Sequence, residues 1–559
     1  MRARARPGAV EELGVQGDDG RRMHAWNLHA REPGGPLTAR RRWRDGTRRK
    51  GQGRNPSMHE QGNSHRPMVP TKPPNEGGPT TSEVVEERGL VKENAGQQNT
   101  HRTQCRARVH SALDGVRQIA RRDKDVKFTA LFHHITIERL RLAFMETNRK
   151  AATGVDEVTW AQYEVNLEAN LLDLHQRLRS GAYRAKPSRR VYIPKADGRQ
   201  RPLGVAALED KIVQRAAAEV LNAIYEVLNA IYEEDFLEFS YGFRPKRGQH
   251  DALDALVTGL KGRVSFVLDA DVRGFFDAIS HGWLVKFIEH RIADKRVLRL
   301  IQKWLNAGVV EDGTWMKCEE GTPQGATVSP LLANIYLHYV LDLWVQQWRN
   351  RTARGDVIVT RFADDFIVGF QYRSDAEEFL RALKQRLQQF SLELHPEKTR
   401  LIEFGRFAAK NRKQAKLGAP ETFDFLGFTH ACGTTEKGKF QVERRTMQKR
   451  MTAKLHELKL ELQRRRHQPI PEQGRWLRQV VEGHFGYYGV PGNMKRLRSF
   501  RDQVKRLWVR ALRRRGQRDK MNWKRMTRLE ARWLPPVRWR HPWPEARFDA
   551  TIRDKNRMR

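Results

Sequence analysis

The sequence has few cysteines, fewer acidic than basic residues and no long hydrophobic run. Its three cysteines lie far apart in 559 residues, and no two form a C-x-x-C pair. This pattern argues against a disulfide framework or a cysteine-based zinc finger and favours a reducing compartment. No stretch approaches the ~20 apolar residues of a membrane helix, and the Arg-rich start lacks the apolar segment of a signal peptide. We therefore expect a soluble, intracellular chain with no membrane partner.

Positive charge is in large excess. The chain has 105 Lys and Arg against 66 Asp and Glu, which gives a net charge of +39. An excess of this size indicates a polyanionic partner, and nucleic acid is the commonest. Hydrophobic residues make up 39% of the chain, enough for a sizeable core, and the length predicts about three or four structural units.

The first 105 residues differ from the rest. They are rich in Arg, Gly, Pro, Asn and Gln and show almost no periodic apolar pattern. Such a segment buries too little apolar surface to offset the entropy of ordering, so we expect 1–105 to be a disordered basic extension. A start of translation at Met58 or Met68 would explain the same composition.

Ordered patterning begins after this segment. Apolar residues between 135 and 144 predict a helix with one buried face, within an N-terminal helical extension over 106–160. From 161 to 430 helices alternate with short β-type runs near 191, 264, 357 and 366. This mixture predicts an α+β fold with an antiparallel sheet.

The chain beyond 440 is helical and strongly basic. Apolar residues at 447–462 and at 494–512 recur at helical spacing. Residues 441–559 contain 34 Lys and Arg against 11 Asp and Glu, hence +23 of the +39, and six of the 14 tryptophans. A solvated face is the ordinary explanation of one charge run, but interleaved Trp and basic residues favour RNA contacts. The expected RNA-binding residues are Arg444, Arg445, Lys449, Arg450, Arg464, Arg465, Arg466, Lys495, Arg496, Arg513, Arg514 and Arg515.

The heptad VLNAIYE occurs twice in succession, at 220–226 and 227–233. Seven residues are close to two helical turns, so the second copy nearly preserves the buried face of a helix over 211–233 while lengthening it by about 10 Å. We expect the fold to survive and the extra turns to be absorbed between about 219 and 238.

Two aspartates lie in a predicted hairpin. In VIVTRFADDFIVGF, β-type stretches flank Asp364 and Asp365. Aspartate is common in turns because its side chain bonds nearby backbone, so this pair alone is a weak signal.

A second run strengthens the signal. In VSFVLDADVRGFFDAI, Asp269 and Asp271 are two residues apart on a predicted strand and leave the same face. Carboxylates from a strand end and a hairpin are ligands suited to two Mg²⁺ ions, which activate a primer 3′-hydroxyl and stabilise a leaving pyrophosphate. Upstream, Lys195 and Arg201 flank an Asp-Gly turn and have the chemistry to hold a triphosphate.

Eight sequence blocks, in this order, resemble the fingers and palm of a reverse transcriptase of the group II intron-encoded type. They are AATGVDEVTW, RRVYIPKADGRQRPLGV, FSYGFRPKRGQHDAL, LDADVRGFFDAIS, GTPQGATVSPLLANIYL, RFADDFIVGF, LHPEKTR and FDFLGF. The basic segment that ends in GHFGYYGVPGN is similar to the thumb, or maturase, domain of that family. The resemblance implies a right-hand polymerase with fingers and palm over 161–430, a helical thumb over 431–515 and a basic nucleic-acid-binding segment over 516–559.

The resemblance also implies residue roles. Asp271, Asp364 and Asp365 would be catalytic and would bind two Mg²⁺, or Mn²⁺, together with the backbone carbonyl of Val272. Asp269 is the alternative to Asp271, but Asp271 places Phe276 five residues on, where these polymerases hold the side chain that excludes a ribose 2′-hydroxyl. The deoxynucleotide contacts would be Lys195, Arg201, Phe276 and Gln324.

The implied function is an RNA-directed DNA polymerase that binds its group II intron RNA, assists its splicing and supports its mobility. Its partners would be that RNA, a DNA target or primer, and deoxynucleotides, in the cytoplasm of a prokaryotic cell and at the nucleoid when acting on DNA. Monomer and homodimer both fit.

The chain departs from the family in Phe362, where Tyr is commoner, in Ala326, where Gly is usual, and in the duplicated heptad. Two other functions stay open: an RNA-binding splicing protein with an inactive polymerase site, and a polymerase of the RNA-directed RNA or retron type. We expect no C-terminal zinc endonuclease, because no ligand set follows Cys432.

Overall fold

The computed structural model describes residues 118–547, except 121, 124, 195–199, 224–234, 245, 323–325, 327 and 516–520; at 194, 201 and 217–223 it describes the backbone alone. The chain divides into Met1–Lys92 and Glu93–Arg559, and every described residue belongs to the second unit. The predicted extension 1–105 and most of the duplicated heptad therefore lie outside the described residues. Within the described part, no helix is long and apolar enough to cross a bilayer.

The first described elements are helical. They are η1 (Phe132–His134), α2 (Ile137–Glu146), α3 (Trp160–Glu164) and α4 (Leu167–Ser180). The Thr136 side chain accepts a hydrogen bond from the amide of Arg139 and so caps α2. The helix predicted from the apolar residues at 135–144 therefore begins at Ile137, and Ile135 lies before it.

A four-stranded sheet follows, in the order β2-β1-β4-β5. Its strands are β1 (Ser188–Pro194), β2 (Gln200–Val205), β4 (Val309–Glu311) and β5 (Thr314–Met316). β1 pairs with β2 antiparallel and with β4 parallel, so this sheet is not wholly antiparallel. The helices α5 (Leu208–Ala223) and α7 (Gln249–Leu260) come next in the chain.

A second four-stranded sheet, which we call the central sheet, has the order β6-β7-β3-β8 and only antiparallel pairs. Its strands are β3 (Phe266–Ala270), β6 (Val357–Phe362), β7 (Asp365–Phe370) and β8 (Arg400–Glu403). The antiparallel sheet predicted from the β-type runs is thereby confirmed.

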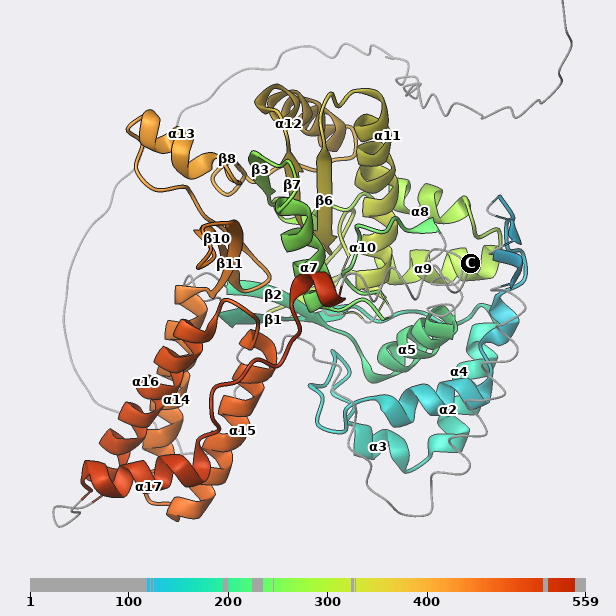
Figure 1. Ribbon diagram of the computed structural model, residues 1–559. Coiled ribbons are helices and arrows are strands. Elements are labelled where there is room, and N and C mark those ends of the chain that lie inside the picture. The colour runs from blue at the N-terminus through green and yellow to red at the C-terminus, as the bar shows by residue number, and fades with distance from the viewer. Residues whose placement is uncertain are drawn as a thin grey trace, which may run out of the picture. The chain divides into compact units, whose positions relative to one another are not determined.

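Helices cover both faces of the central sheet (Figure 1). Phe366, Val368 and Phe370 of β7 belong to one buried core, and Ile367 belongs to another that includes Leu253 and Leu256 of α7. The surrounding elements are η2 (Phe275–Asp277), α8 (His281–Glu289), α9 (Lys295–Leu305), α10 (Ser329–Leu337), η3 (His338–Asp342), α11 (Leu343–Arg351) and α12 (Arg373–Gln388).

A three-stranded sheet leads from the central sheet to the C-terminal helices. Its order is β11-β10-β9, with β9 (Phe423–Phe425), β10 (Phe428–Thr434) and β11 (Phe440–Thr446), preceded by α13 (Ala408–Gln414). The C-terminal helices are α14 (Gln448–Arg464), α15 (Ile470–Tyr488), α16 (Met494–Arg513) and α17 (Trp523–Trp533).

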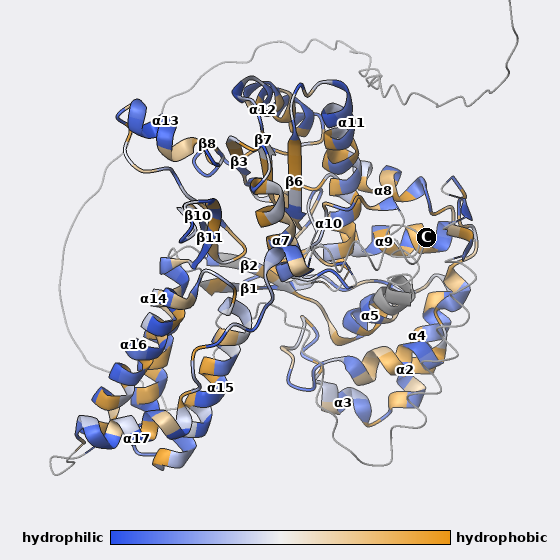
Figure 2. Cartoon of the chain, in the orientation of Figure 1, coloured by the Kyte–Doolittle hydropathy of each residue, from blue (hydrophilic) through white to orange (hydrophobic). Residues whose placement is uncertain are grey.

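The C-terminal helices have a core of their own. Leu497, Phe500, Val504, Trp508 and Leu512 of α16 are fully buried in it, as the apolar spacing at 494–512 predicted. In Figure 2 hydrophobic and hydrophilic residues alternate along α14 and α16, whereas β6 is largely hydrophobic. The outer faces of these helices therefore carry their basic residues to solvent.

Candidate active site

Asp364 and Asp365 lie at the turn between β6 and β7. Phe362, which ends β6, pairs with Asp365, which begins β7, so Ala363 and Asp364 form a two-residue turn. Ala363 has a φ of 56°, and such positive values are what tight hairpin turns require. The predicted hairpin with two carboxylates at its turn is confirmed.

The pairing of β3 with β7 brings Asp271 to the same place. The antiparallel register sets Ala270 opposite Phe366, so the residue after Ala270 lies beside the residue before Phe366. These residues are Asp271 and Asp365. Asp269 is opposite Ile367, two pairs further into the sheet.

The carboxylates interact electrically. Desolvation by the surrounding protein raises the pKa of Asp365 to about 7, and the charges of Asp364, Asp271 and Asp269 contribute to this rise in that order. Desolvation also raises the pKa of Asp269 to about 6, against the opposing effect of Arg400. The four acidic groups therefore form one cluster of like charge. Asp271 raises the pKa of Asp365 more strongly than Asp269 does.

Two cations at the start of β8 and just before it balance this cluster. Lys398 Nζ lies 2.5 Å from Asp271 Oδ2, and Arg400 Nη2 lies 3.4 Å from Asp269 Oδ2. Both cations belong to LHPEKTR, a block that sequence reasoning named without assigning a role to either residue. No local pattern in the sequence indicated these contacts, because they join residues 127 and 131 positions apart.

After β3, the carbonyl of Val272 makes no hydrogen bond in the β-bridge between Val272 and Leu394. Val272 forms a bridge with Leu394, and its hydrogen bonds run from Arg273 N to Glu393 O (2.8 Å) and from His395 N to Asp271 O (2.8 Å). These bonds use the carbonyl of Asp271 and the amide of Arg273. The Val272 carbonyl is not used by this bridge, which is compatible with the role expected for it.

A buried arginine holds the hairpin turn. Arg361 is fully buried and donates from Nε and Nη2 to both carboxylate oxygens of Asp342, at 2.7 and 2.6 Å. Its Nη1 donates to Ala363 O in the turn (2.9 Å) and to Asn334 Oδ1 (3.0 Å). A bidentate pair of this kind fixes geometry as well as charge, so the position of Asp364 is tied to η3 and α10.

The segment before α7 closes over the same turn. Tyr241 N donates to Arg361 O, and Arg361 N donates to Phe239 O, both at 2.8 Å. A Cβ added to Gly242 would lie 2.3 Å from Ala363 N, so a side chain cannot fit there. These residues belong to FSYGFRPKRGQHDAL, and sequence reasoning missed their supporting role because the contact joins segments about 120 residues apart.

The expected nucleotide-binding residues are only partly described. Phe276 lies in η2 and is half-buried, and its carbonyl accepts a hydrogen bond from Thr322 N (2.7 Å), at the start of the GTPQG loop. Lys195 and Gln324 lie outside the described residues, and of Arg201 only the backbone is described, opposite Ile193 in β2. The geometry thus brings Phe276 and Thr322 together.

The chemistry of the three aspartates suits divalent metal ions. Asp271, Asp364 and Asp365 offer carboxylate oxygens, which Mg²⁺ prefers, and their mutual repulsion favours a bound cation. Among the described residues, however, no three His, Cys, Asp or Glu side chains are close enough together to hold a metal ion. In this structure Lys398 supplies the positive charge beside Asp271.

Comparison with known proteins matches this region of the chain to one family. Residues 193–430, which run from the end of β1 into β10, match the reverse transcriptase (RNA-dependent DNA polymerase) family. The chain carries a reverse transcriptase domain.

Curated proteins similar to the chain fit this assignment. Protein YkfC of Escherichia coli is 37% identical over 246 residues, 38% of this chain and 62% of that protein. The group II intron-encoded protein LtrA of Lactococcus lactis is 34% identical over 247 residues, 43% of this chain and 39% of LtrA. An uncharacterized 91 kDa protein in the cob intron of Schizosaccharomyces pombe is 40% identical over 175 residues, 31% of this chain and 21% of that protein. The chain thus spans less than two thirds of each.

Arg444, which we expected to bind RNA, is buried, so that prediction is wrong. The side chain of Arg444 is only 2% exposed, and its Nη1 lies 2.5 Å from Asp254 Oδ1 of α7. Its neighbour Arg445 points the other way, is 46% exposed and pairs with Glu443. Because residues alternate along β11, only one of the two can face solvent. Arg444 is a structural ion-pair residue.

The other expected RNA-binding residues lie on or next to α14 and α16. Arg515 Nε donates to Arg466 O (2.6 Å), which brings these two basic clusters together from 49 positions apart. Arg465 pairs with Glu461, and Arg496 donates to Gln448. Together with Arg445, the exposed members of the expected set are Lys449, Arg464, Lys495, Arg513 and Arg514.

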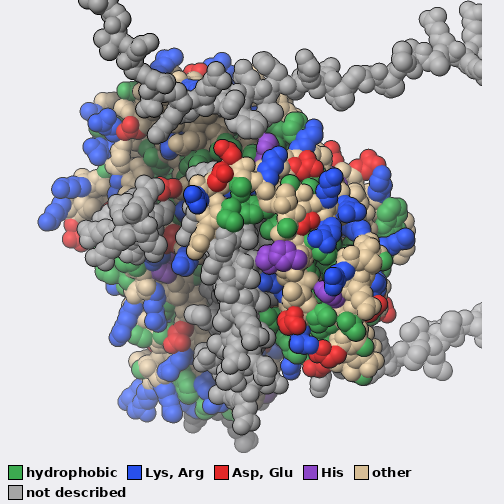
Figure 3. All heavy atoms as spheres, turned by 90° about the vertical axis from the view of Figure 1, so that its right-hand side faces the viewer, with side chains coloured by type: hydrophobic (Ala, Val, Ile, Leu, Met, Phe, Trp, Pro, Cys, Tyr) green, Lys and Arg blue, Asp and Glu red, His purple; other side chains and the backbone are tan. Residues whose placement is uncertain are grey.

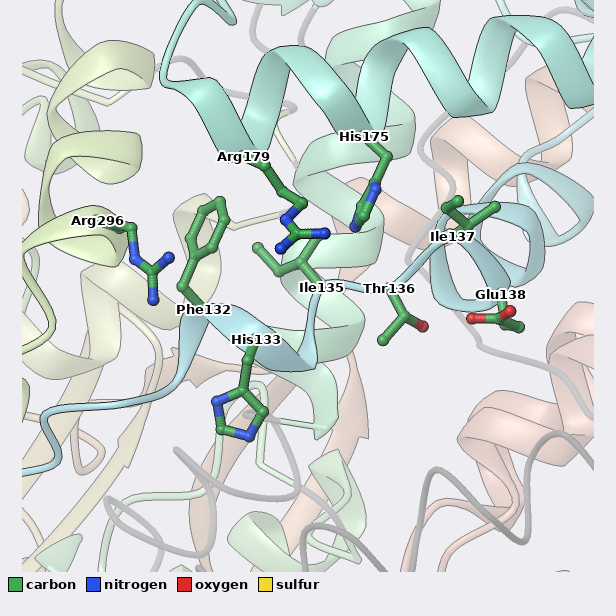
Figure 4. A pocket seen from close by; sticks show the side chains of 9 residues that line it. All are labelled: Phe132, His133, Ile135, Thr136, Ile137, Glu138, His175, Arg179 and Arg296. Carbon is green, nitrogen blue, oxygen red and sulfur yellow. The ribbon is translucent and has the colours of Figure 1, made fainter.

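A cavity of about 350 Å³ lies among the N-terminal helices (Figure 4). Its lining includes His175 and Arg179 of α4, Arg296 of α9 and Thr136. No predicted site residue lines it, so this hollow is separate from the aspartates. On the face shown in Figure 3, Lys and Arg side chains are interspersed with Asp and Glu and form no single patch.

Proposed function

We propose that the chain is an RNA-directed DNA polymerase that binds group II intron RNA, assists its splicing and supports its mobility. The observation that carries the proposal is the β3–β7 register, which sets Asp271 beside the Asp364–Asp365 turn within a domain that matches reverse transcriptases. The similarity to LtrA, a group II intron-encoded protein, supports the intron part. The activity would take place in the cytoplasm of a prokaryotic cell.

The polymerase chemistry would depend on metal ions. Asp271, Asp364, Asp365 and the Val272 carbonyl would hold two Mg²⁺, or Mn²⁺, which together lower the pKa of a primer 3′-hydroxyl and stabilise a leaving pyrophosphate. The protein's own contribution is placement. Arg361 holds the turn that carries Asp364, and Lys398 balances the charge of Asp271.

The nucleotide would lie between the metal site and the first sheet. Lys195 and Arg201 would contact the triphosphate, and Gln324 would contact the new base pair. Phe276, half-buried and five residues after Asp271, would lie against the sugar and leave no room for a 2′-hydroxyl. Selection of deoxynucleotides favours a DNA polymerase over an RNA-directed RNA polymerase.

In this proposal the elements would correspond to the parts of a right-hand polymerase. The central sheet would be the palm, the β2-β1-β4-β5 sheet with the N-terminal helices the fingers, and α14–α16 the thumb. The domain limits expected from the sequence, with 161–430 for fingers and palm, 431–515 for the thumb and 516–559 for a basic segment, are retained as part of this proposal.

Primer extension tests the polymerase activity. The full chain, given an RNA template with an annealed DNA primer, Mg²⁺ and deoxynucleotides, should extend the primer. An absence of extension, with the RNA still bound and spliced, would show the alternative function, a splicing protein without polymerase activity.

The RNA-binding part is tested by removing exposed charge. Replacing Lys495 and Arg513 by Gln should weaken intron RNA binding and reduce the log–log salt slope by about 0.7–0.9 for each phosphate that is no longer neutralised. The matched control replaces Arg381 and Lys384 of α12, which are also exposed. Equal weakening by both pairs would contradict a specific RNA-binding role for the C-terminal helices.

A further inference from the structure

After α17 the chain leaves the C-terminal helices and runs to α7 (Figure 1). We call residues 534–547 the C-terminal strap. At its start, Leu534 is buried and Arg501 Nε donates to Pro535 O at 2.9 Å. At its end, Arg547 Nε lies 3.1 Å from Asp254 Oδ2 of α7, and Glu545 pairs with Lys261. Both ends of the strap are therefore anchored.

The middle of the strap is also fixed. The amides of Arg540 and His541 donate to Gly489 O, at 2.8 and 3.2 Å. The His541 ring stacks on His250 with centroids 3.7 Å apart, and its Nε2 lies 2.6 Å from Gly486 O. These contacts hold the middle of the strap against α15 and α7. We call the side that makes them the inner side and the opposite side the outer side.

The outer side presents two tryptophans to solvent. Trp539 is 52% exposed and Trp543 is 47% exposed, with ring centroids 5.9 Å apart and planes at 67°. In the same part of the molecule Trp508 is fully buried. Burial of an indole is favourable, so two exposed rings on an anchored segment point to a binding role.

Two arginines flank Trp539 in the sequence. The side chains of Arg538 and Arg540 are exposed, and within the described residues neither has an ion-pair partner. Cationic groups beside exposed aromatic faces are the combination by which proteins hold single strands, because bases stack on the rings and phosphates meet the cations.

We propose that the outer side of the C-terminal strap binds a single-stranded stretch of nucleic acid, with bases stacked on Trp539 and Trp543 and phosphates near Arg538 and Arg540. Paired bases are already stacked and hide their faces, so a duplex does not offer what these rings need. The inference rests on the proposed function in one respect: a polymerase that copies RNA holds an unpaired template.

The decisive experiment compares oligouridylate with an abasic oligonucleotide of the same length, both labelled, by fluorescence anisotropy on the full chain. Replacing Trp539 and Trp543 together by Ala should weaken oligouridylate binding about tenfold or more, since base stacking contributes strongly to such affinities. Binding of the abasic strand should stay within about twofold. Phe at both positions keeps a ring and should restore much of the affinity.

Two controls complete the design. Trp315→Ala removes a tryptophan that is 54% exposed on β5 and should change neither affinity. Arg538→Gln with Arg540→Gln should weaken both oligonucleotides alike and reduce the salt slope by about 0.7 for each phosphate that is no longer neutralised.

Three results would overturn the inference. They are unchanged oligouridylate binding by the double Trp variant, an equal loss for both strands, or a change in self-association without a change in nucleic-acid binding. Primer extension on an annealed template reports separately on the proposed polymerase, because oligonucleotide affinity is measured without deoxynucleotides.

Discussion

Phe276 bears on both the assignment of the metal ligands and the selection of the nucleotide. It follows Asp271 by five positions, lies in η2 and contacts the Phe275 ring at a centroid distance of 5.4 Å. Its ring packs partly against the core and is partly exposed to solvent. Its role can therefore be tested apart from the metal ligands.

Replacing Phe276 by Ala should admit ribonucleotides, because the space beside the sugar C2′ opens while the carboxylates stay in place. The measurement is the ratio of kcat/KM for a deoxynucleotide to that for the matching ribonucleotide. Phe275→Ala is unsuitable as a control because Phe275 is buried, so Phe276→Tyr, which keeps the ring, serves instead. If the wild type and Phe276→Ala discriminate equally, the register that selects Asp271 over Asp269 is wrong.

Some residues of the site could be predicted locally and others could not. Alternating apolar residues around Asp364 and Asp365 indicate a hairpin without any distant information. That Asp271 lies beside Asp365 depends on strand pairing across 94 positions, which only the resemblance to reverse transcriptases implied. Lys398 and Arg361 act through contacts between distant segments, so no local pattern could assign their roles.

At the scale of elements, β11 shows why a run of charge is a poor guide to function. Arg444 and Arg445 are neighbours in sequence, yet one pairs with Asp254 in the interior and the other with Glu443 at the surface. The partner of Arg444 lies 190 positions away. Its burial could not be predicted from the basic segment alone.

This pair of neighbours gives a matched test of stability. Arg444→Ala should lower the free energy of unfolding by about 3–5 kcal/mol, because it leaves Asp254 buried without one of its partners. Arg445→Ala should cost about 1 kcal/mol or less, as exposed ion pairs do. Denaturant unfolding measures both, and equal costs would contradict the assignment of Arg444 as an ion-pair residue.

The contact between α7 and the C-terminal strap predicts a pH dependence. Desolvation, with the positive charges of His541, Arg547 and Arg444, lowers the pKa of His250 from 6.5 to about 3. The imidazole is therefore neutral when folded and takes up a proton on unfolding below pH 6.5. Its contribution to stability is complete above pH 6.5 and is lost as the pH falls towards 3.

Replacing His250 by Phe removes this titration but keeps a ring against His541. Between pH 7.5 and 5 the variant should lose less unfolding free energy than the wild type, by up to about 2 kcal/mol. The difference between the two proteins isolates His250 from Asp254, whose pKa is raised by desolvation and opposed by Arg444 and Arg547. Parallel pH profiles would contradict a buried neutral His250.

At the scale of the whole molecule, the described part of the chain has one proposed chemical centre and a long basic periphery. The net charge of +39 explains attraction to nucleic acid but no catalysis, which needs the carboxylates at the central sheet. Composition could predict the attraction to nucleic acid. The arrangement of the carboxylates depends on three strands, residues 266–270, 357–362 and 365–370. The proposed function depends on that arrangement.

The most direct test is single-turnover primer extension on an RNA template by Asp364→Asn, beside Asp356→Asn as control. Asp356 lies just before β6, at the far end of the same hairpin, and its side chain is 58% exposed. Asp364→Asn should abolish extension while RNA affinity stays within about twofold, because the carboxylate serves the metal site and not the phosphate contacts. Asp356→Asn should extend normally. Substantial extension by Asp364→Asn would contradict the assignment of the active site.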